Sequence, residues 1–227
     1  MRRSAARRAW LQRFAAGGAL AGGGILGIIG RALARGDLGL RQGVVQLEGT
    51  ATVNGRHVRV GAAVEVGQRI ATGPGSHAVI VLGKDAFLLR DNTSIETKGA
   101  SGVLSELVVS TGKILSVFSR KPLSIRASYA TIGIRGTGCY IEVAPADVYF
   151  CLCYGEAVVQ GPGMADKLVK TTHHDMPLLL REEGPAMQAD KAKFRNHTDV
   201  ELVMLEALVG REPPFMKDGK YPAGKYG

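Results

Sequence analysis

The sequence predicts an all-β fold, a sandwich or jelly roll of short antiparallel strands, that ends in a short C-terminal helix. Two observations indicate it. Between Gly43 and Gly161, short apolar segments alternate with turns rich in Gly, Asn, Asp and Pro, which is typical of β-sandwiches and barrels. Near residue 200, the apolar residues recur instead at helical spacing.

Strands are expected wherever apolar or β-branched residues lie between two turn signals. Asn54-Gly55 predicts a hairpin, because both residues tolerate the positive φ angles of a type I′ turn. Gly83-Lys84-Asp85 and Thr111-Gly112-Lys113 mark two further turns. The expected strands are 44–48, the two arms of a hairpin at 52–58, then 78–82, 87–89, 94–97, 107–109, 114–118, 123–126, 139–144, 148–153, 167–170 and 178–180.

One helix is expected, at about residues 199–209. Thr198 and Glu201 have the spacing of a capping box, in which each side chain bonds the backbone N–H of the other residue. Gly210 suits the left-handed C-terminal position, and Pro213-Pro214 prevent continuation. A helix this short is unstable alone in water, so we expect it to dock on the sheet. Its apolar stripe comprises Leu202, Leu205, Leu208 and Val209.

The most distinctive segment is Arg135-Gly136-Thr137-Gly138, which leads into an expected strand. With the turns before it, this segment resembles the signature of FecR-type domains, which are extracytoplasmic β-modules. The resemblance covers roughly residues 43–160. Its other landmarks are 72–76, 83–85, 91–94 and 112–114.

The FecR resemblance implies a module that senses, binds a ligand or acts as a scaffold, and that does not catalyse a reaction. Its implied partner is another envelope protein or a small ligand. FecR proteins of the signalling type carry a cytoplasmic anti-sigma region and a membrane helix before this module, whereas here an export signal leads almost directly into it. Standalone, exported versions are therefore the closer comparison. The signature itself is expected to be structural: Gly136 and Gly138 permit tight backbone conformations, and the Arg135 guanidinium suits a loop anchor.

Residues 1–34 are predicted to be a targeting segment. Arg7-Arg8 precede an apolar stretch at 14–29, and Ala32-Leu33-Ala34 supplies a cleavage site. The pattern looks like a twin-arginine export signal, which predicts a periplasmic or secreted protein. The alternative is an uncleaved membrane anchor, although the stretch is shorter than the roughly 20 residues of a spanning helix. The rest is divided into a β-domain, 35–161, and a C-terminal extension, 162–227, with further strands, the helix and a mobile tail.

The charge argues against a nucleic-acid partner. The chain has a formal net charge of +9, but six of its arginines and no acidic residue lie in the first 34 residues, which leaves +3 for the remainder. Nucleic-acid binding needs a concentrated basic face. Membrane contact is expected only through the targeting segment, if it is not cleaved.

The three cysteines, Cys139, Cys151 and Cys153, lie close together in the sequence. Cys151 and Cys153 are two residues apart in an expected strand, so both thiols face the same side. If residues 145–147 form the preceding turn, Cys139 lies opposite Cys153, whereas a slip of one residue would put it on the other face. Three interpretations stay open: buried apolar side chains, a disulfide of Cys139 with Cys153 or Cys151, and metal binding by Cys151 and Cys153.

His173 and His174, followed by Asp175, are candidates to complete a metal site. In a strand only one histidine would reach the cysteines, whereas in a turn both would. Thiolates and imidazoles suit a transition metal such as zinc, copper or iron. The alternative is an exposed strand end. His197 directly precedes the capping box, and we expect it to serve local packing.

No catalytic motif is visible: the chain contains no Gly-x-Ser-x-Gly, His-Glu-x-x-His or Walker sequence. A Cys151–His173 nucleophile pair is the remaining enzyme hypothesis. The sequence therefore predicts a non-catalytic binding or sensing module. The alternative is a metal-binding or thiol-redox protein that uses Cys151, Cys153 and His173 or His174.

Overall fold

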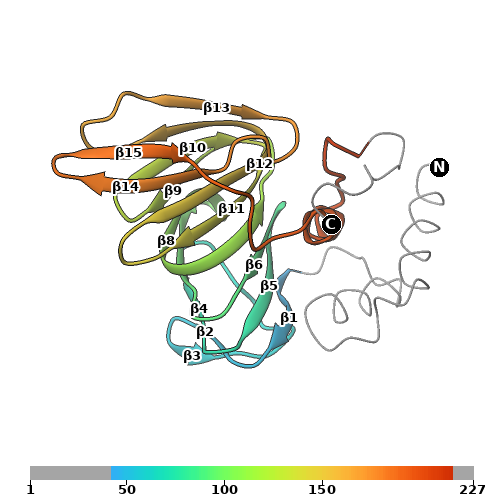
Figure 1. Ribbon diagram of the computed structural model, residues 1–227. Helices are drawn as coiled ribbons and strands as arrows, with labels where there is room; N and C mark the ends of the chain where they lie inside the picture. Colours follow the sequence, from blue (N-terminus) through green and yellow to red (C-terminus); the bar gives the residue numbers. More distant parts are fainter. Residues whose placement is uncertain (1–41, 217–227) are drawn as a thin grey trace.

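The computed structural model describes residues 42–216, and within them strands dominate (Figure 1). The targeting segment and the mobile tail that the sequence predicts both lie outside the described residues. The strands are β1 (Gly43–Glu48), β2 (Ala51–Val53), β3 (Arg56–His57), β4 (Arg69–Thr72), β5 (His77–Leu82), β6 (Asp85–Leu89), β7 (Ser94–Ala100), β8 (Val103–Val117), β9 (Pro122–Ala127), β10 (Ala130–Arg135), β11 (Gly138–Val143), β12 (Val148–Gln160), β13 (Lys167–Thr171), β14 (Leu178–Glu183) and β15 (Ala186–Lys191). One helix, α3 (Asp199–Leu208), follows them, so the predicted all-β fold with a short C-terminal helix is confirmed.

Two long strands, β8 and β12, connect two sheets into one structure. The first sheet, here called sheet A, has the order β1-β5-β6-β8-β11-β12-β14-β15. Sheet B has the order β3-β2-β4-β7-β8-β9-β10-β12-β13. Every pair is antiparallel except β8 with β9. Because β8 and β12 run through both sheets, the two layers are held face to face.

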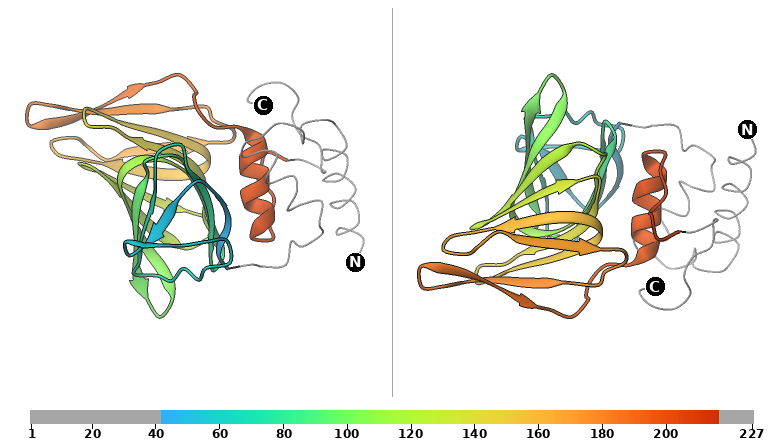
Figure 2. Two further views of the ribbon diagram at one scale, coloured as in Figure 1. Left: turned by 90° about the horizontal axis from the view of Figure 1, so that it is seen from below. Right: turned by 90° about the horizontal axis from the view of Figure 1, so that it is seen from above.

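Sheet A is covered on both faces. Phe87, Ile141 and Phe150 point into the core between the sheets, whereas their neighbours Leu88 and Tyr149 point into a second core under α3. In both views of Figure 2 the helix lies along one side of the β-structure. Two-sided burial explains why β5 and β6 are continuously apolar and do not alternate apolar with polar residues.

The capping box predicted for the helix is confirmed. The Thr198 hydroxyl accepts a hydrogen bond from the Glu201 backbone N–H at 3.3 Å, and the Glu201 carboxylate accepts one from the Thr198 N–H at 2.9 Å. The chain leaves the helix through Gly210, which has a φ of 75°. The helix ends at Leu208, one residue before the expected end, and its apolar stripe docks on sheet A as predicted.

Strands that follow Pro162 continue the sheets that precede it. β13 pairs with the second half of β12, and β14 pairs with its first half. The tight hairpin predicted at Asn54-Gly55 is also present, with Val53 paired to Arg56 and φ angles of 50° and 76°. In the part of the chain that the structure describes, no helix has the length and apolarity needed to cross a membrane.

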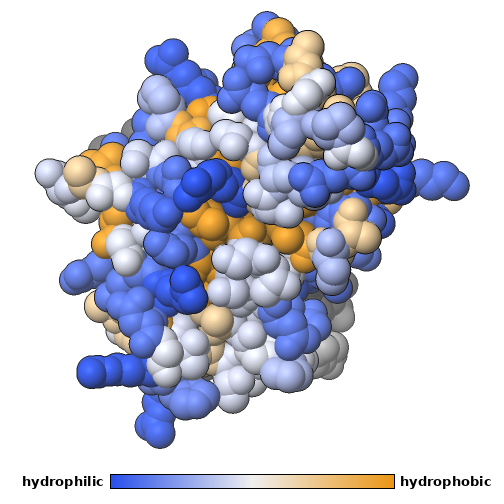
Figure 3. Space-filling model, turned by 90° about the vertical axis from the view of Figure 1, so that its left-hand side faces the viewer, coloured by the Kyte–Doolittle hydropathy of each residue, from blue (hydrophilic) through white to orange (hydrophobic). Residues whose placement is uncertain are grey.

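A shallow groove of about 610 Å³ lies over sheet B, between β9, β10, β12 and β13. Apolar residues, among them Leu123, Ile134 and Leu168, form much of its lining. On the side of the molecule that faces away from α3, apolar side chains are visible in a hollow between polar rims (Figure 3). The groove contains none of the cysteines or histidines, so the chemistry of the chain lies elsewhere.

Candidate metal centre

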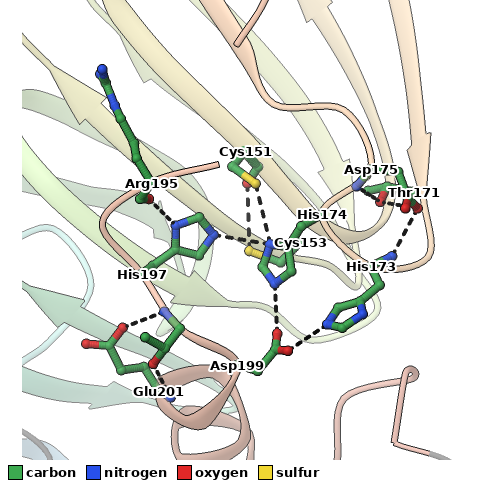
Figure 4. Close-up of polar contacts among 11 residues, drawn as sticks. Cys151, Cys153, Thr171, His173, His174, Asp175, Arg195, His197, Asp199 and Glu201 are labelled. Carbon is green, nitrogen blue, oxygen red and sulfur yellow. Dashed lines mark hydrogen bonds and ion pairs between the residues drawn. The ribbon is translucent and has the colours of Figure 1, made fainter. Parts of the chain in front are cut away.

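Cys151 and Cys153 project from β12 toward the helix. Phe150 and Leu152 of the same strand point into the core between the sheets, so the two cysteines share the opposite face, as predicted. Both thiols are fully buried beneath the C-terminal segment. Figure 4 shows them beside His174 and His197.

The register predicted for Cys139 was wrong by one residue. The turn between β11 and β12 includes Ala144, whose N–H donates to the Asp147 carbonyl at 3.0 Å, so Val143 pairs with Val148. Cys139 consequently pairs with Leu152 and points into the core between the sheets. A one-residue shift reverses the face of a strand residue. Cys151 and Cys153 face the other core, and all three cysteines are free thiols, so the suggested disulfide of Cys139 with Cys153 or Cys151 is wrong.

A tight turn after β13 positions His173 and His174. The Asp175 carboxylate accepts hydrogen bonds from the backbone N–H groups of Thr172 at 3.0 Å and His173 at 3.2 Å. His174 has a φ of 53°, in the left-handed region that histidine adopts more readily than most residues. Its backbone N–H donates to the Cys153 carbonyl at 3.0 Å. These bonds fix the turn against β12.

Of the two adjacent histidines, the structure brings only His174 to the cysteines. Its Nδ1 lies 3.5 Å from the Cys151 Sγ, and its Nε2 lies 2.9 Å from one oxygen of Asp199. His173 instead contacts the other Asp199 oxygen at 2.8 Å and stacks on Phe215. The prediction that named either histidine is therefore narrowed to His174 at the thiols.

His197 is the residue that sequence reasoning missed. Its Nε2 lies 3.2 Å from the His174 Nδ1, and its Nδ1 lies 2.7 Å from the Arg195 carbonyl oxygen. The ring also stacks on Tyr140, with centroids 4.5 Å apart. His197 thus makes the packing contact that the sequence predicts, and it also lies beside His174 and the two thiols. A signal was available: His197 directly precedes the N-cap of a helix expected to dock on the sheet.

Four donor atoms converge, from Cys151, Cys153, His174 and His197, and all lie within 4.8 Å of one another. Tetrahedral zinc with Zn–S of about 2.3 Å and Zn–N of about 2.05 Å places two nitrogens about 3.3 Å apart and a nitrogen and a sulfur about 3.5 Å apart. The observed separations are 3.2 Å between the two nitrogens and 3.5 Å from the Cys151 Sγ to the His174 Nδ1. These two separations match those of a tetrahedral zinc site, and all four donor atoms lie within 4.8 Å of one another.

The hydrogen bonds of the two imidazoles leave their inner nitrogens facing each other. The His174 Nε2 faces the Asp199 carboxylate and the His197 Nδ1 faces the Arg195 carbonyl, and both partners only accept hydrogen bonds. Each neutral imidazole then carries its hydrogen on that outer nitrogen. The inner nitrogens, 3.2 Å apart, present lone pairs to each other. A metal ion or an additional proton relieves that repulsion.

The partners of the outer nitrogens are those that metal-binding histidines commonly have. A carboxylate or a backbone carbonyl on the second nitrogen fixes the tautomer and orients the ring toward the metal. Asp199 plays this part for His174, and Arg195 does so for His197 (Figure 4). Asp199 is fully buried, which strengthens its interaction with the imidazoles.

The pKa values of the Cys151 and Cys153 thiols are shifted in opposite directions. The hydrogen bond from Cys153, with smaller effects of His174 and His197, outweighs burial and lowers the pKa of Cys151 to about 4. Burial and the neighbouring Cys151 raise the pKa of Cys153. Burial alone would lower the pKa of His174, but its bonds to Asp199 and Cys151 raise it. The metal-free site therefore favours a Cys151 thiolate, beside a His174 that takes up a proton more readily than a free imidazole.

The FecR-like signature lies at the junction of β10 and β11. Gly136 has a φ of 65°, and a Cβ on Gly138 would lie 2.6 Å from the Tyr154 ring. Thr137 is buried, and its carbonyl accepts a hydrogen bond from Phe118 at 2.9 Å. Arg135 is exposed, and within residues 42–216 no side-chain hydrogen bond of it is seen. The glycines and Thr137 shape this junction.

No protein-family model and no curated protein matches the chain. Two crystal structures of a candidate anti-sigma factor from Parabacteroides distasonis are similar to parts of it. The first has a TM-score of 0.46 and 11% identity over 54% of this chain and 59% of that one. The second has a TM-score of 0.46 and 13% identity over 60% of this chain and 70% of that one. The chain thus spans well under two thirds of the first.

The fold and the site together describe an all-β protein in which a docked C-terminal helix covers a buried Cys₂His₂ group. The cysteines come from a central strand and the histidines from two separate segments that reach it.

Proposed function

We propose that this protein is a non-catalytic, exported β-module that binds one transition-metal ion, of which zinc fits best, through Cys151, Cys153, His174 and His197. The observation that carries the proposal is the pair of inner imidazole nitrogens, 3.2 Å apart, beside two co-facial thiols. Two sulfurs and two nitrogens in a tetrahedral arrangement suit zinc, whereas hard cations prefer oxygen ligands.

The closed character of the site favours a structural or sensing role over catalysis. Catalytic zinc sites keep one position for water or substrate, while structural sites use four protein ligands. Here all four candidate ligands are buried. The same burial disfavours the alternative of a Cys–His nucleophile, because a substrate would have no access to the Cys151 thiolate.

Metal analysis of the purified full chain tests this proposal. After reduction and loading with zinc, elemental analysis should give about one zinc per chain, as expected for a single Cys₂His₂ site. The double variant Cys151→Ser, Cys153→Ser should lose it. Cys139→Ala is the matched control, because Cys139 is equally buried but faces the other core. A chain that retains no zinc, or that loses it equally in the Cys139 variant, would exclude the site.

The thiol-redox alternative makes a different prediction. If Cys151 and Cys153 were a redox pair, mild oxidation should join them reversibly in the presence of saturating zinc. A metal site predicts the opposite, because zinc-bound thiolates are protected from the oxidant. Mass spectrometry of alkylated protein, with and without zinc, distinguishes the two.

The Arg135-Gly136-Thr137-Gly138 signature supports a second candidate function, that of a FecR-like sensing or scaffold module in the cell envelope. The two functions are compatible, since a sensing module can carry a metal. Its partner would be another envelope protein or a small ligand. Affinity capture of the exported protein from envelope extracts, compared with a variant carrying Gly138→Ala, tests for a partner that depends on this junction.

A further inference from the structure

The four candidate ligands come from three segments that differ in how firmly they are held. Cys151 and Cys153 lie on β12, which pairs with four other strands. His174 lies in the turn tied to Cys153 and Asp175. His197 belongs to the linker between β15 and α3, directly before the N-cap Thr198. The position of His197 therefore depends on whether the helix is docked.

Helix α3 belongs to neither sheet, so contacts of its side chains hold it against sheet A. Leu202 and Leu205 are buried in the second core. At its start, Glu201 pairs with Arg90 at 2.9 Å. At its end, Glu206 contacts Tyr154 of β12, and Arg211 donates a hydrogen bond to the Lys84 carbonyl at 2.5 Å. These contacts give the helix its place, but they break together if the C-terminal segment lifts away.

The metal has no open route to the ligands. The four residues are between 0% and 3% exposed. β12 is an interior strand of both sheets, so it does not move without breaking its pairing with neighbours on both sides. The C-terminal segment, residues 192–216, covers the thiols from the other side and carries His197 and Asp199. Metal uptake and loss consequently require this segment to open.

We propose that metal occupancy controls the docking of α3 on sheet A, so that metal loss releases the helix and exposes the second core. This inference rests on the proposed metal binding. A bound ion joins His197 to both cysteines and to His174. Without the metal, a proton can bridge only the two histidines. The link that the ion would make between Cys153 and the C-terminal segment is then lost. Release of α3 uncovers an apolar face of sheet A that includes Val81, Leu88 and Leu115. Bound metal thus keeps α3 docked, and loss of the metal exposes the apolar face of sheet A.

Hydrogen–deuterium exchange of the full chain, reduced and at neutral pH, tests this directly. Removing zinc with a chelator should speed exchange of the amides of residues 199–208 by at least roughly tenfold, the usual size of coupling between two sites. Peptides from β5 and β12 should exchange unchanged. If zinc binds but α3 keeps its protection after zinc is removed, or if every strand then loses protection equally, metal-controlled docking of α3 is refuted while metal binding stands. If no zinc binds, both proposals fail.

Reciprocity supplies a second test that leaves all four ligands intact. If zinc stabilises docking, weakened docking must weaken zinc binding by the same factor. Leu205→Ala should therefore lower zinc affinity, again by roughly tenfold. Leu180→Ala is the matched control, because Leu180 is equally buried but lies in the core between the sheets. Equal zinc affinity in the Leu205 variant and the wild type would overturn the proposal.

Discussion

His174 and His197 direct their inner nitrogens at each other across 3.2 Å, although 23 residues separate them in the chain. Each ring is held in that position by a hydrogen bond that its outer N–H donates, to the Asp199 carboxylate from His174 and to the Arg195 carbonyl from His197. When both rings are neutral, the inner nitrogens present lone pairs to each other, and two thiols lie beside them. The predictions below follow from this relationship and from the elements that create it.

Asp199 should tune metal affinity without touching the metal. Asp199→Asn keeps the shape of the side chain but removes the charge that orients His174 and supports its basicity. We expect zinc affinity to fall by about 10- to 100-fold, the usual effect of losing such a partner. Competition with a chromophoric chelator measures it. Asp190→Asn, at an exposed position of β15, is the control and should bind zinc like the wild type. Unchanged affinity in Asp199→Asn would contradict the assigned role.

Zinc affinity should fall as the pH falls, because protons compete for the ligands. Cys151, with a pKa of about 4, is already a thiolate at neutral pH. The pKa of Cys153 is raised, so this thiol holds a proton that the metal must displace, and the raised pKa of His174 strengthens the competition from protons. Binding should therefore release protons. Calorimetry in buffers of different ionisation enthalpy detects that release, and identical heats in all buffers would contradict the ligand set.

The capping box should stabilise the docked helix. Thr198→Ala removes the hydroxyl that accepts from the Glu201 N–H and should lower the free energy of unfolding by about 1 kcal/mol. Thr198→Ser retains the hydroxyl and serves as the control. Denaturant unfolding of the metal-free protein gives both values. Equal stability of the Ala and Ser variants would mean that the cap contributes nothing.

Gly138 should not tolerate a side chain. A Cβ there would lie 2.6 Å from the Tyr154 ring, which is buried under α3. Gly138→Ala should therefore destabilise the protein by about 1–3 kcal/mol, the cost of overpacking. Gly133→Ala, on the neighbouring β10, is the control, because its nearest atom would be 4.0 Å away. A Gly138 variant that melts with the Gly133 variant would show that the contact relaxes freely.

Export remains a prediction of the sequence alone. Arg7→Lys combined with Arg8→Lys should block export, because the twin-arginine pair is read by its own receptor. The mature protein should begin at Arg35, which N-terminal sequencing of periplasmic material checks. Normal export of the double Lys variant would exclude the twin-arginine route.

Local chemistry made much of the fold predictable. Most strand positions followed from apolar segments between turns, and the Asn54-Gly55 hairpin followed from the φ angles that its turn requires. The strands β4, β10 and β15 were not predicted, and the turn predicted at Thr111-Gly112-Lys113 was wrong, because β8 runs through it without a break. The helix could be placed to within one residue, because capping and helical periodicity are properties of adjacent residues. The shared face of Cys151 and Cys153 likewise follows from the two-residue period of a strand.

Only the tertiary structure decided the composition of the site. A single extra residue in the β11–β12 turn moved Cys139 to the other core, and turn length is not fixed by the strand pattern. The choice of His174 depended on a left-handed backbone conformation set by hydrogen bonds to Asp175. His197 reached the thiols because α3 docks on sheet A, and that contact arises from burial of apolar surface between segments far apart in the chain. The sequence determined which side chains could bind a metal, and long-range packing decided which of them meet.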